Sequence, residues 1–143
     1  MAYLLFQSYQ NLRGRPFIKP KNVIMADQSS VELFLSRKLF LEHDITVATA
    51  AQSLKVSRNV LSKTIAESGF KNFIEFVNEY RLSHFLAMVE EKAHLKLSIM
   101  GMAESSGFKS KATINRVFKA QMGLTPSVYI NQKSRVEKPV AVH

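Results

Sequence analysis

The sequence contains one amphipathic pattern twice, about 52 residues apart, and this repeat limits the possible fold more than any other feature. In each copy a short helical pattern is followed by a tight turn and a second helical pattern. The first copy covers residues 45–65 and the second covers residues 97–118. Two short helices that cross steeply at a tight turn form a helix-turn-helix. The repeat therefore predicts two such units in one chain.

The turn of each copy needs a small residue where its helices touch and a residue that tolerates positive φ. Ala51 and Ala103 supply the small residue. Gly107 adopts positive φ at no steric cost, whereas Lys55 stands at the corresponding place in the first copy. We therefore expect the first turn to have a different geometry. Gly-Phe-Lys occurs at 69–71 and 107–109, non-equivalent points of the repeat, and we interpret this as coincidence.

The longest helical pattern joins the two copies and covers about residues 72–91, with apolar residues at spacings of three and four. A helix of this length spans ~30 Å. This is close to the ~34 Å between successive major grooves on one side of B-DNA. The helix is thus either a spacer between two DNA-reading elements or a central core helix, and both descriptions can hold together.

Helix signals continue on both sides of the repeat. Ser29 or Ser30 can cap a helix that ends near His43, and Thr125-Pro126 can begin a short last helix. No segment has a convincing strand pattern. We therefore predict an all-α, homeodomain-like fold of about seven helices, in which a long central helix joins two helix-turn-helix subdomains.

The expected domain organisation has three parts. Residues 1–29 form a linker or the remnant of a preceding domain, since they combine Pro, Gly and basic residues. Residues 30–131 form the folded body. The polar residues 132–143 form a flexible tail. Within the body we place the first helix-turn-helix at about 45–68, the linker helix at about 72–91 and the second helix-turn-helix at about 97–122.

The formal net charge of +9 favours an anionic partner, which can be a nucleic acid, a membrane surface or an acidic protein. The chain has no cysteine, which excludes disulfides, thiolate zinc sites and a cysteine nucleophile, and fits a reducing cytosol. No apolar run approaches the ~20 residues of a membrane-spanning helix. The four histidines lie far apart without metal-ligand spacing, so we expect no metal, no cofactor and no enzymatic activity.

The second helix of each copy has the polar, basic character that a DNA major groove requires. Neither helix has a carboxylate in its first two turns, although an ordinary solvated helix, the alternative interpretation, commonly has one. Arg and Lys suit guanine edges or phosphates, and Asn suits adenine. The candidate DNA-binding residues are Ser57, Arg58, Asn59, Ser62 and Lys63 in the first copy, and Ser110, Lys111, Thr113, Asn115, Arg116 and Lys119 in the second.

Several spaced motifs resemble the DNA-binding domain of AraC/XylS-type transcription regulators. The best match is GFKSKATINRVFKAQMGLTPSVYI at 107–130, and NEYRL at 78–82 and SRN-x-LS at 57–62 are also similar. The resemblance covers residues ~30–131. It departs from the family pattern at Phe70, which stands where a glycine is usual, at Phe85, where a small residue is usual, and at Ile130, where an arginine is usual.

The resemblance implies a cytoplasmic, nucleoid-associated regulator that binds double-stranded DNA sequence-specifically. It also implies RNA polymerase as a partner, and a sensing domain or dimer partner outside this chain, since residues 1–29 are too few for a ligand pocket. The alternative is a helical protein-interaction module that has lost DNA binding and modulates another regulator. The family's base-reading positions correspond to Asn59, Ser62, Lys63, Lys111, Ala112, Asn115 and Arg116.

Overall fold

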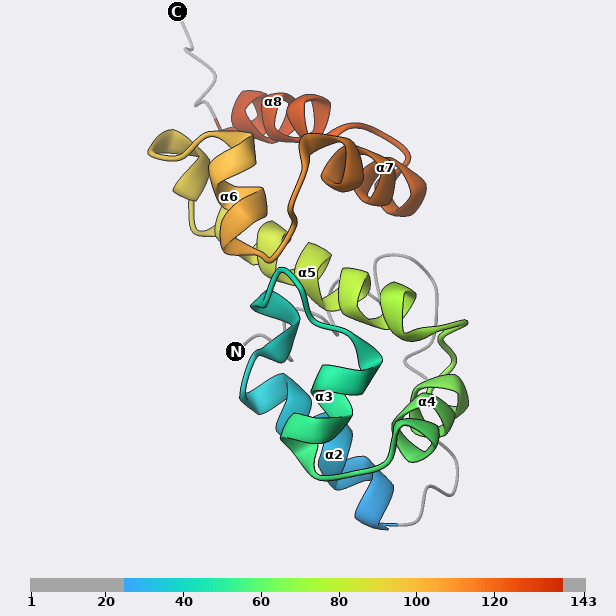
Figure 1. The fold of residues 1–143 in the computed structure, drawn as a ribbon. Helices are drawn as coiled ribbons and strands as arrows, with labels where there is room; N and C mark the ends of the chain where they lie inside the picture. Colours follow the sequence, from blue (N-terminus) through green and yellow to red (C-terminus); the bar gives the residue numbers. More distant parts are fainter. Residues whose placement is uncertain (1–24, 138–143) are drawn as a thin grey trace, which may run out of the picture.

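The computed structural model describes residues 25–137, which form helices and connecting turns without any strand (Figure 1). This confirms the all-α prediction. No helix in this range is long and apolar enough to span a bilayer. The described elements are α2 (Met25–Ser36), the 3₁₀ helix η1 (Leu39–Leu41), α3 (Val47–Leu54), α4 (Arg58–Glu67), α5 (Phe73–Glu90), the 3₁₀ helix η2 (Ala93–Leu95), α6 (Ile99–Ser105), α7 (Lys111–Met122) and α8 (Pro126–Glu137).

Helix α5 separates two groups of helices, with α2, α3 and α4 on one side and α6, α7 and α8 on the other (Figure 1). We call these groups the first unit and the second unit. Each has its own hydrophobic core, to which α5 contributes one half of its length. Tyr80, near the middle of α5, packs against both cores. The linker helix is therefore a core helix, as one of the two sequence interpretations had it, and its role as a spacer between DNA-reading elements stays a prediction.

The first core is built around aromatic rings from α2 and α5. Phe34 and Phe76 are almost completely buried, with ring centroids 5.2 Å apart. Phe76 also meets Tyr80 in an edge-to-face arrangement at 5.0 Å. Leu61 and Ile65 of α4 are buried in the same core. These contacts hold one face of α4 inward and leave its other face to solvent.

The second core is likewise built around aromatic rings, here those that contact α7. Phe85 of α5 is fully buried and meets Phe118 of α7 edge-to-face at 5.8 Å. Phe118 in turn meets Tyr129 of α8 at 5.4 Å. The bulky residue at position 85, unusual for the AraC-type pattern, therefore fills the second core. Ile130, the other departure in this region, is also buried here, at 9% exposure.

Side-chain caps begin six of the described helices. Thr46, Ser57, Ser98 and Ser110 each accept a hydrogen bond from the backbone N–H three residues later. Asn72 does the same for α5, and Thr125 does the same for α8 at 3.4 Å. The starts of the helices in both helix-turn-helix units are therefore fixed by local sequence.

The predicted start and end of the first helix were wrong. Helix α2 already includes Met25, so Ser29 and Ser30 lie inside it. The preceding Met-Ala-Asp-Gln segment contains good helix formers, which extend the helix without a serine cap. The helix also ends early, at Ser36, because Lys38 takes the left-handed conformation with φ 53° and starts η1.

Residues 132–137, which we expected in a flexible tail, continue α8 as regular helix. Two contacts explain this extension. The Lys133 ammonium pairs with the Glu90 carboxylate of α5. The same ammonium lies 6.0 Å from the centre of the Tyr129 ring. The predicted linker at 1–24 and the tail at 138–143 lie outside the described residues.

Candidate nucleic-acid interface

The turns of the two helix-turn-helix units begin with the same left-handed conformation and the same hydrogen bond, contrary to our expectation for the first, although the second turn has one more residue before the next helix cap. Lys55 has φ 58° and Gly107 has φ 95°, both in the left-handed region. In the first turn the Val56 N–H donates to the Ala51 carbonyl at 3.0 Å, and in the second the Phe108 N–H donates to the Ala103 carbonyl at 2.9 Å. This is the hydrogen bond of a Schellman motif. Lys55 therefore accepts the conformation that Gly107 adopts freely.

Gly69 ends α4 by the same motif, with φ 93° and a hydrogen bond of 3.4 Å from the Phe70 N–H to the Ile65 carbonyl. The Gly-Phe parts of the two triplets thus have the same local role at a helix end, which the sequence interpretation as coincidence did not foresee. Glycine takes the left-handed position, and the phenylalanine packs back on the helix that it ends. The departure at Phe70 leaves the helix end intact, because Gly69 supplies the positive φ.

Helix α4 presents a polar face formed by the sequence-predicted residues. The Ser57 hydroxyl accepts from the Val60 N–H at 3.1 Å, so it is engaged as the cap. The Lys63 ammonium lies 3.9 Å from the Glu67 carboxylate, one turn later, but most of its side chain is exposed. Exposed pairs of this kind contribute little stability, and Lys63 can exchange this partner for a phosphate. Arg58, Asn59, Ser62 and Lys63 are all exposed.

Helix α7 presents the corresponding face of the second unit. The Ser110 hydroxyl accepts from the Thr113 N–H at 3.1 Å and lies 2.9 Å from the Thr113 hydroxyl, so both hydroxyls are engaged at the helix start. Asn115 is half-buried. The opposite face is buried in the second core. The exposed candidates are Lys111, Ala112, Arg116 and Lys119.

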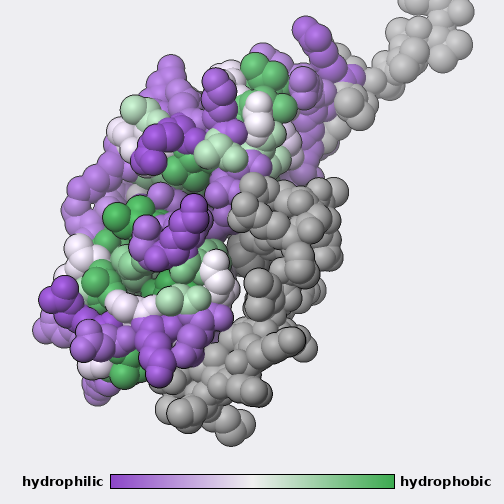
Figure 2. Space-filling view, turned by 90° about the vertical axis from the view of Figure 1, so that its right-hand side faces the viewer, coloured by the Kyte–Doolittle hydropathy of each residue, from purple (hydrophilic) through white to green (hydrophobic). Residues whose placement is uncertain are grey.

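Both helices lie toward the same side of the molecule, at the right of Figure 1. Figure 2 looks onto this side and shows mainly hydrophilic residues, with smaller apolar areas between them. Helix α7 has no acidic residue, and α4 has one, Glu67, at its last position. The structure thus brings both helices to one side of the molecule, with little negative charge on either helix.

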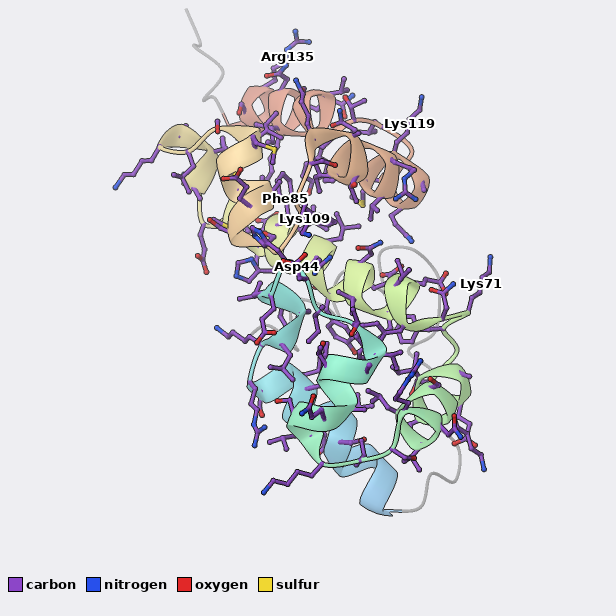
Figure 3. The ribbon with its side chains drawn as sticks, in the orientation of Figure 1. Asp44, Lys71, Phe85, Lys109, Lys119 and Arg135 are labelled. Carbon is purple, nitrogen blue, oxygen red and sulfur yellow. The ribbon has the colours of Figure 1, made fainter. Side chains whose placement is uncertain are left out.

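Lys71 is a further candidate that the sequence analysis did not name. It is exposed in the loop between α4 and α5, and in Figure 3 its side chain extends into solvent on the same side as Lys119. Its backbone N–H donates to the Glu75 carboxylate at 2.6 Å, which fixes the loop at the start of α5. The available signal was its position just before the helix cap Asn72, where a basic side chain can reach a phosphate.

Two capped, basic helices, each placed behind a Schellman turn and exposed on one side, define a double helix-turn-helix protein. A family profile described as a helix-turn-helix domain matches residues 37–132. The chain belongs to this family, and the AraC-type resemblance of its motifs is confirmed. It is therefore a DNA-binding domain of the kind found in AraC-type transcription regulators.

Curated relatives support this assignment. The chain is 38% identical over 85 residues to the uncharacterized HTH-type transcriptional regulator YpdC of Escherichia coli K12, covering 59% of this chain and 29% of that protein. It is 31% identical over 77 residues to the TCP pilus virulence regulatory protein of Vibrio cholerae, covering 54% of this chain and 26% of that protein. The matches thus span less than a third of either relative.

One solved structure has the same fold. The C-terminal domain of AraT, a response regulator from Geobacillus stearothermophilus, matches with a TM-score of 0.56 and 23% identity, over 86% of this chain and 94% of that domain. At this identity the likeness concerns the arrangement of the helices alone.

Proposed function

We propose that this chain is the sequence-specific, duplex-binding part of a transcription regulator, and that α4 and α7 each read one of two adjacent major-groove segments. The observation that carries the proposal is the exposure of both helices on one side, each without a carboxylate in its first two turns. The family membership supports the class of function, and the relatives named as transcriptional regulators support the process.

The proposed roles of the side chains follow from their hydrogen-bonding groups. Asn59 and Asn115 suit adenine, while Arg116 suits guanine. Lysines on and beside the two helices neutralise phosphates and set the register on the duplex. The Ser57 and Ser110 hydroxyls act as caps, so we assign them an indirect role: they hold the first N–H groups of each helix where a phosphate can accept from them.

We propose no chemical reaction for this chain. The proposal includes RNA polymerase as a partner and a sensing or dimerisation domain outside this chain. It also includes a cytoplasmic, nucleoid-associated location. An interaction module without DNA binding is the weaker alternative. It would need an apolar patch on a recognition face, and Val60, at 37% exposure, is the only large apolar side chain exposed among the described residues of α4 and α7.

The experiment is a selection of duplexes from a random pool, followed by titration of the selected duplex at several salt concentrations. If 6–10 phosphates are contacted, affinity falls ~10³–10⁵-fold between 50 and 200 mM salt. A scrambled duplex of the same length is the control and should bind more weakly at every salt concentration. Failure to enrich any sequence, or an affinity independent of salt, would contradict the proposal.

A further inference from the structure

The two units touch each other directly beside α5, through contacts that lie outside the two recognition helices. We call this contact region the inter-unit seam. It joins the segment before α3 to the turn between α6 and α7, with side chains of α5 between them. Its members are Phe40, Glu42, His43 and Asp44 of the first unit, Arg81 and His84 of α5, and Glu104, Gly107 and Lys109 of the second unit.

Arg81 ties the first unit to α5. Its Nε donates to the Phe40 carbonyl and its Nη2 donates to the Glu42 carbonyl, both at 2.7 Å. Burial lowers the pKa of the guanidinium from its usual value. An arginine remains charged in proteins even so, and both bonds are therefore charge-assisted. They fix the backbone of residues 40–42 against the middle of α5.

Gly107 brings the second unit against the same backbone. A Cβ at this position would lie 2.6 Å from the Phe40 carbonyl oxygen, 2.7 Å from Arg81 Nε and 3.1 Å from Leu41 Cα. Two of these three neighbours are backbone atoms, which cannot turn away as a side chain can. The absence of a side chain at Gly107 therefore permits the close approach of the two units as well as the positive φ of the turn.

Two further contacts cross the seam on either side of Gly107. His43 Nε2 donates to the Glu104 carbonyl at 3.0 Å. The Lys109 ammonium pairs with the Asp44 carboxylate, and Figure 3 places these two side chains together where the units meet. Both members of this ion pair are largely exposed, so the pair contributes little to stability and acts mainly on the orientation of the two units.

The seam lies next to the recognition helix of the second unit, because Lys109 immediately precedes the α7 cap Ser110. On the other side, Asp44 lies two residues before the α3 cap Thr46, and α3 packs on α4. We propose that Gly107 and Arg81 are positioning residues that set the distance and rotation between α4 and α7, and thereby select the spacing of the two DNA half-sites. This inference rests on the proposed function.

The matched pair of variants is Gly107→Ala and Gly123→Ala. Both glycines have positive φ, +95° and +79°, so alanine is strained at each. A Cβ at Gly123 meets nothing within 4 Å, whereas a Cβ at Gly107 meets the first unit. The comparison therefore separates displacement of the seam from simple turn strain.

The readout is affinity for duplexes whose half-sites are moved by one or two base pairs in either direction. Each base pair shifts the second half-site by ~3.4 Å along the duplex axis and rotates it by ~35°. We expect the unchanged protein and Gly123→Ala to share one spacing optimum and to lose affinity when the half-sites are moved from it in either direction. We expect Gly107→Ala to have a shifted or flattened spacing optimum. An unchanged optimum in Gly107→Ala would overturn the inference.

A second variant and a DNA-free measurement keep the inference testable if Gly107→Ala does not fold. Arg81→Gln removes the paired donors to residues 40 and 42. The chain has no cysteine, so cysteines placed at Lys63 and Lys119 can carry spin labels without background. We expect a displaced or broader label distance in Arg81→Gln. A distance unchanged from the otherwise unsubstituted labelled protein would overturn the inference, whereas failure of every form to bind duplex would overturn the proposed function alone.

Discussion

Three lysines hold the left-handed backbone conformation that usually belongs to glycine. Lys38, Lys55 and Lys92 have φ values of 53°, 58° and 61°. A residue with a Cβ is disfavoured there by ~1–2 kcal/mol. Lys38 and Lys92 directly precede the 3₁₀ helices, and Lys55 forms the turn of the first helix-turn-helix. The first turn therefore stores strain that the second, with Gly107, avoids.

Replacing Lys55 by glycine should relieve this strain. We expect Lys55→Gly to raise the free energy of unfolding by about 0.5–1 kcal/mol, the gain in the left-handed region less the entropic cost of glycine. Urea titration measures the change. Lys63→Gly, inside α4, is the control and should lower stability by ~1 kcal/mol. A loss of stability in Lys55→Gly would show that the turn is not strained.

Arg116 is the base-reading candidate with the clearest single-residue test. Arg116→Ala should weaken binding to the selected duplex by ~1–3 kcal/mol if the guanidinium contacts guanine. Arg135→Ala removes the same charge from an exposed position on α8 and is the matched control (Figure 3). Gel-shift titration of both variants compares them. Equal binding by the two variants would remove Arg116 from the reading positions.

At the scale of elements, α5 divides its buried side chains between two cores. Phe85 lies in the second, fully buried against Phe118. We expect Phe85→Ala to lower the free energy of unfolding by ~3–5 kcal/mol, through lost burial and the cavity left behind. Ile74→Ala, at a position 68% exposed on the same helix, should change it by less than ~0.5 kcal/mol. Thermal unfolding followed by circular dichroism distinguishes these outcomes.

The sequence predicted those elements whose signals are local. Caps such as Ser57 and Ser110 act within three residues, and so does the glycine that ends a helix, so the helix-turn-helix boundaries and the polar faces of α4 and α7 were predictable. The start of α2 was missed because good helix formers extended it without a cap. The extent of α8 was missed because Lys133 is held by Glu90 of another helix.

The inter-unit seam had no sequence signal for a different reason. Arg81 and Phe40 are 41 residues apart, and Asp44 and Lys109 are 65 apart. The acceptors of Arg81 are backbone carbonyls, which every residue has, so no residue type reveals them. Only the folded arrangement of α5 between the units brings these groups together.

At the scale of the whole molecule, we expect His84 to make stability depend on pH. Its Nδ1 lies 2.9 Å from the Ser106 hydroxyl of the second unit, and its ring packs 6.4 Å from the Phe40 ring of the first. Burial lowers the pKa of His84, the Lys38 charge lowers it further, and the Glu91 carboxylate partly opposes the shift. The folded protein therefore resists protonation of this group at the centre of the molecule.

Because the pKa is lower in the folded state, the unfolded chain takes up the proton first as pH falls below about 6.5. We therefore expect the free energy of unfolding to decrease from pH 7 toward the lower, folded-state pKa. His84→Gln should make this decrease shallower. Urea titrations at a series of pH values measure both slopes, and identical slopes would contradict the role of His84.

Carrying two reading helices on one polypeptide has a consequence for how tightly a monomer can bind. If α4 reads its groove as proposed, α7 is then confined close to the neighbouring groove, so the second contact would form at a high effective concentration. The two contacts, each weak alone, would then combine into tighter binding by a single chain. This gain in avidity would be lost if either unit unfolded, since the remaining helix-turn-helix would bind alone.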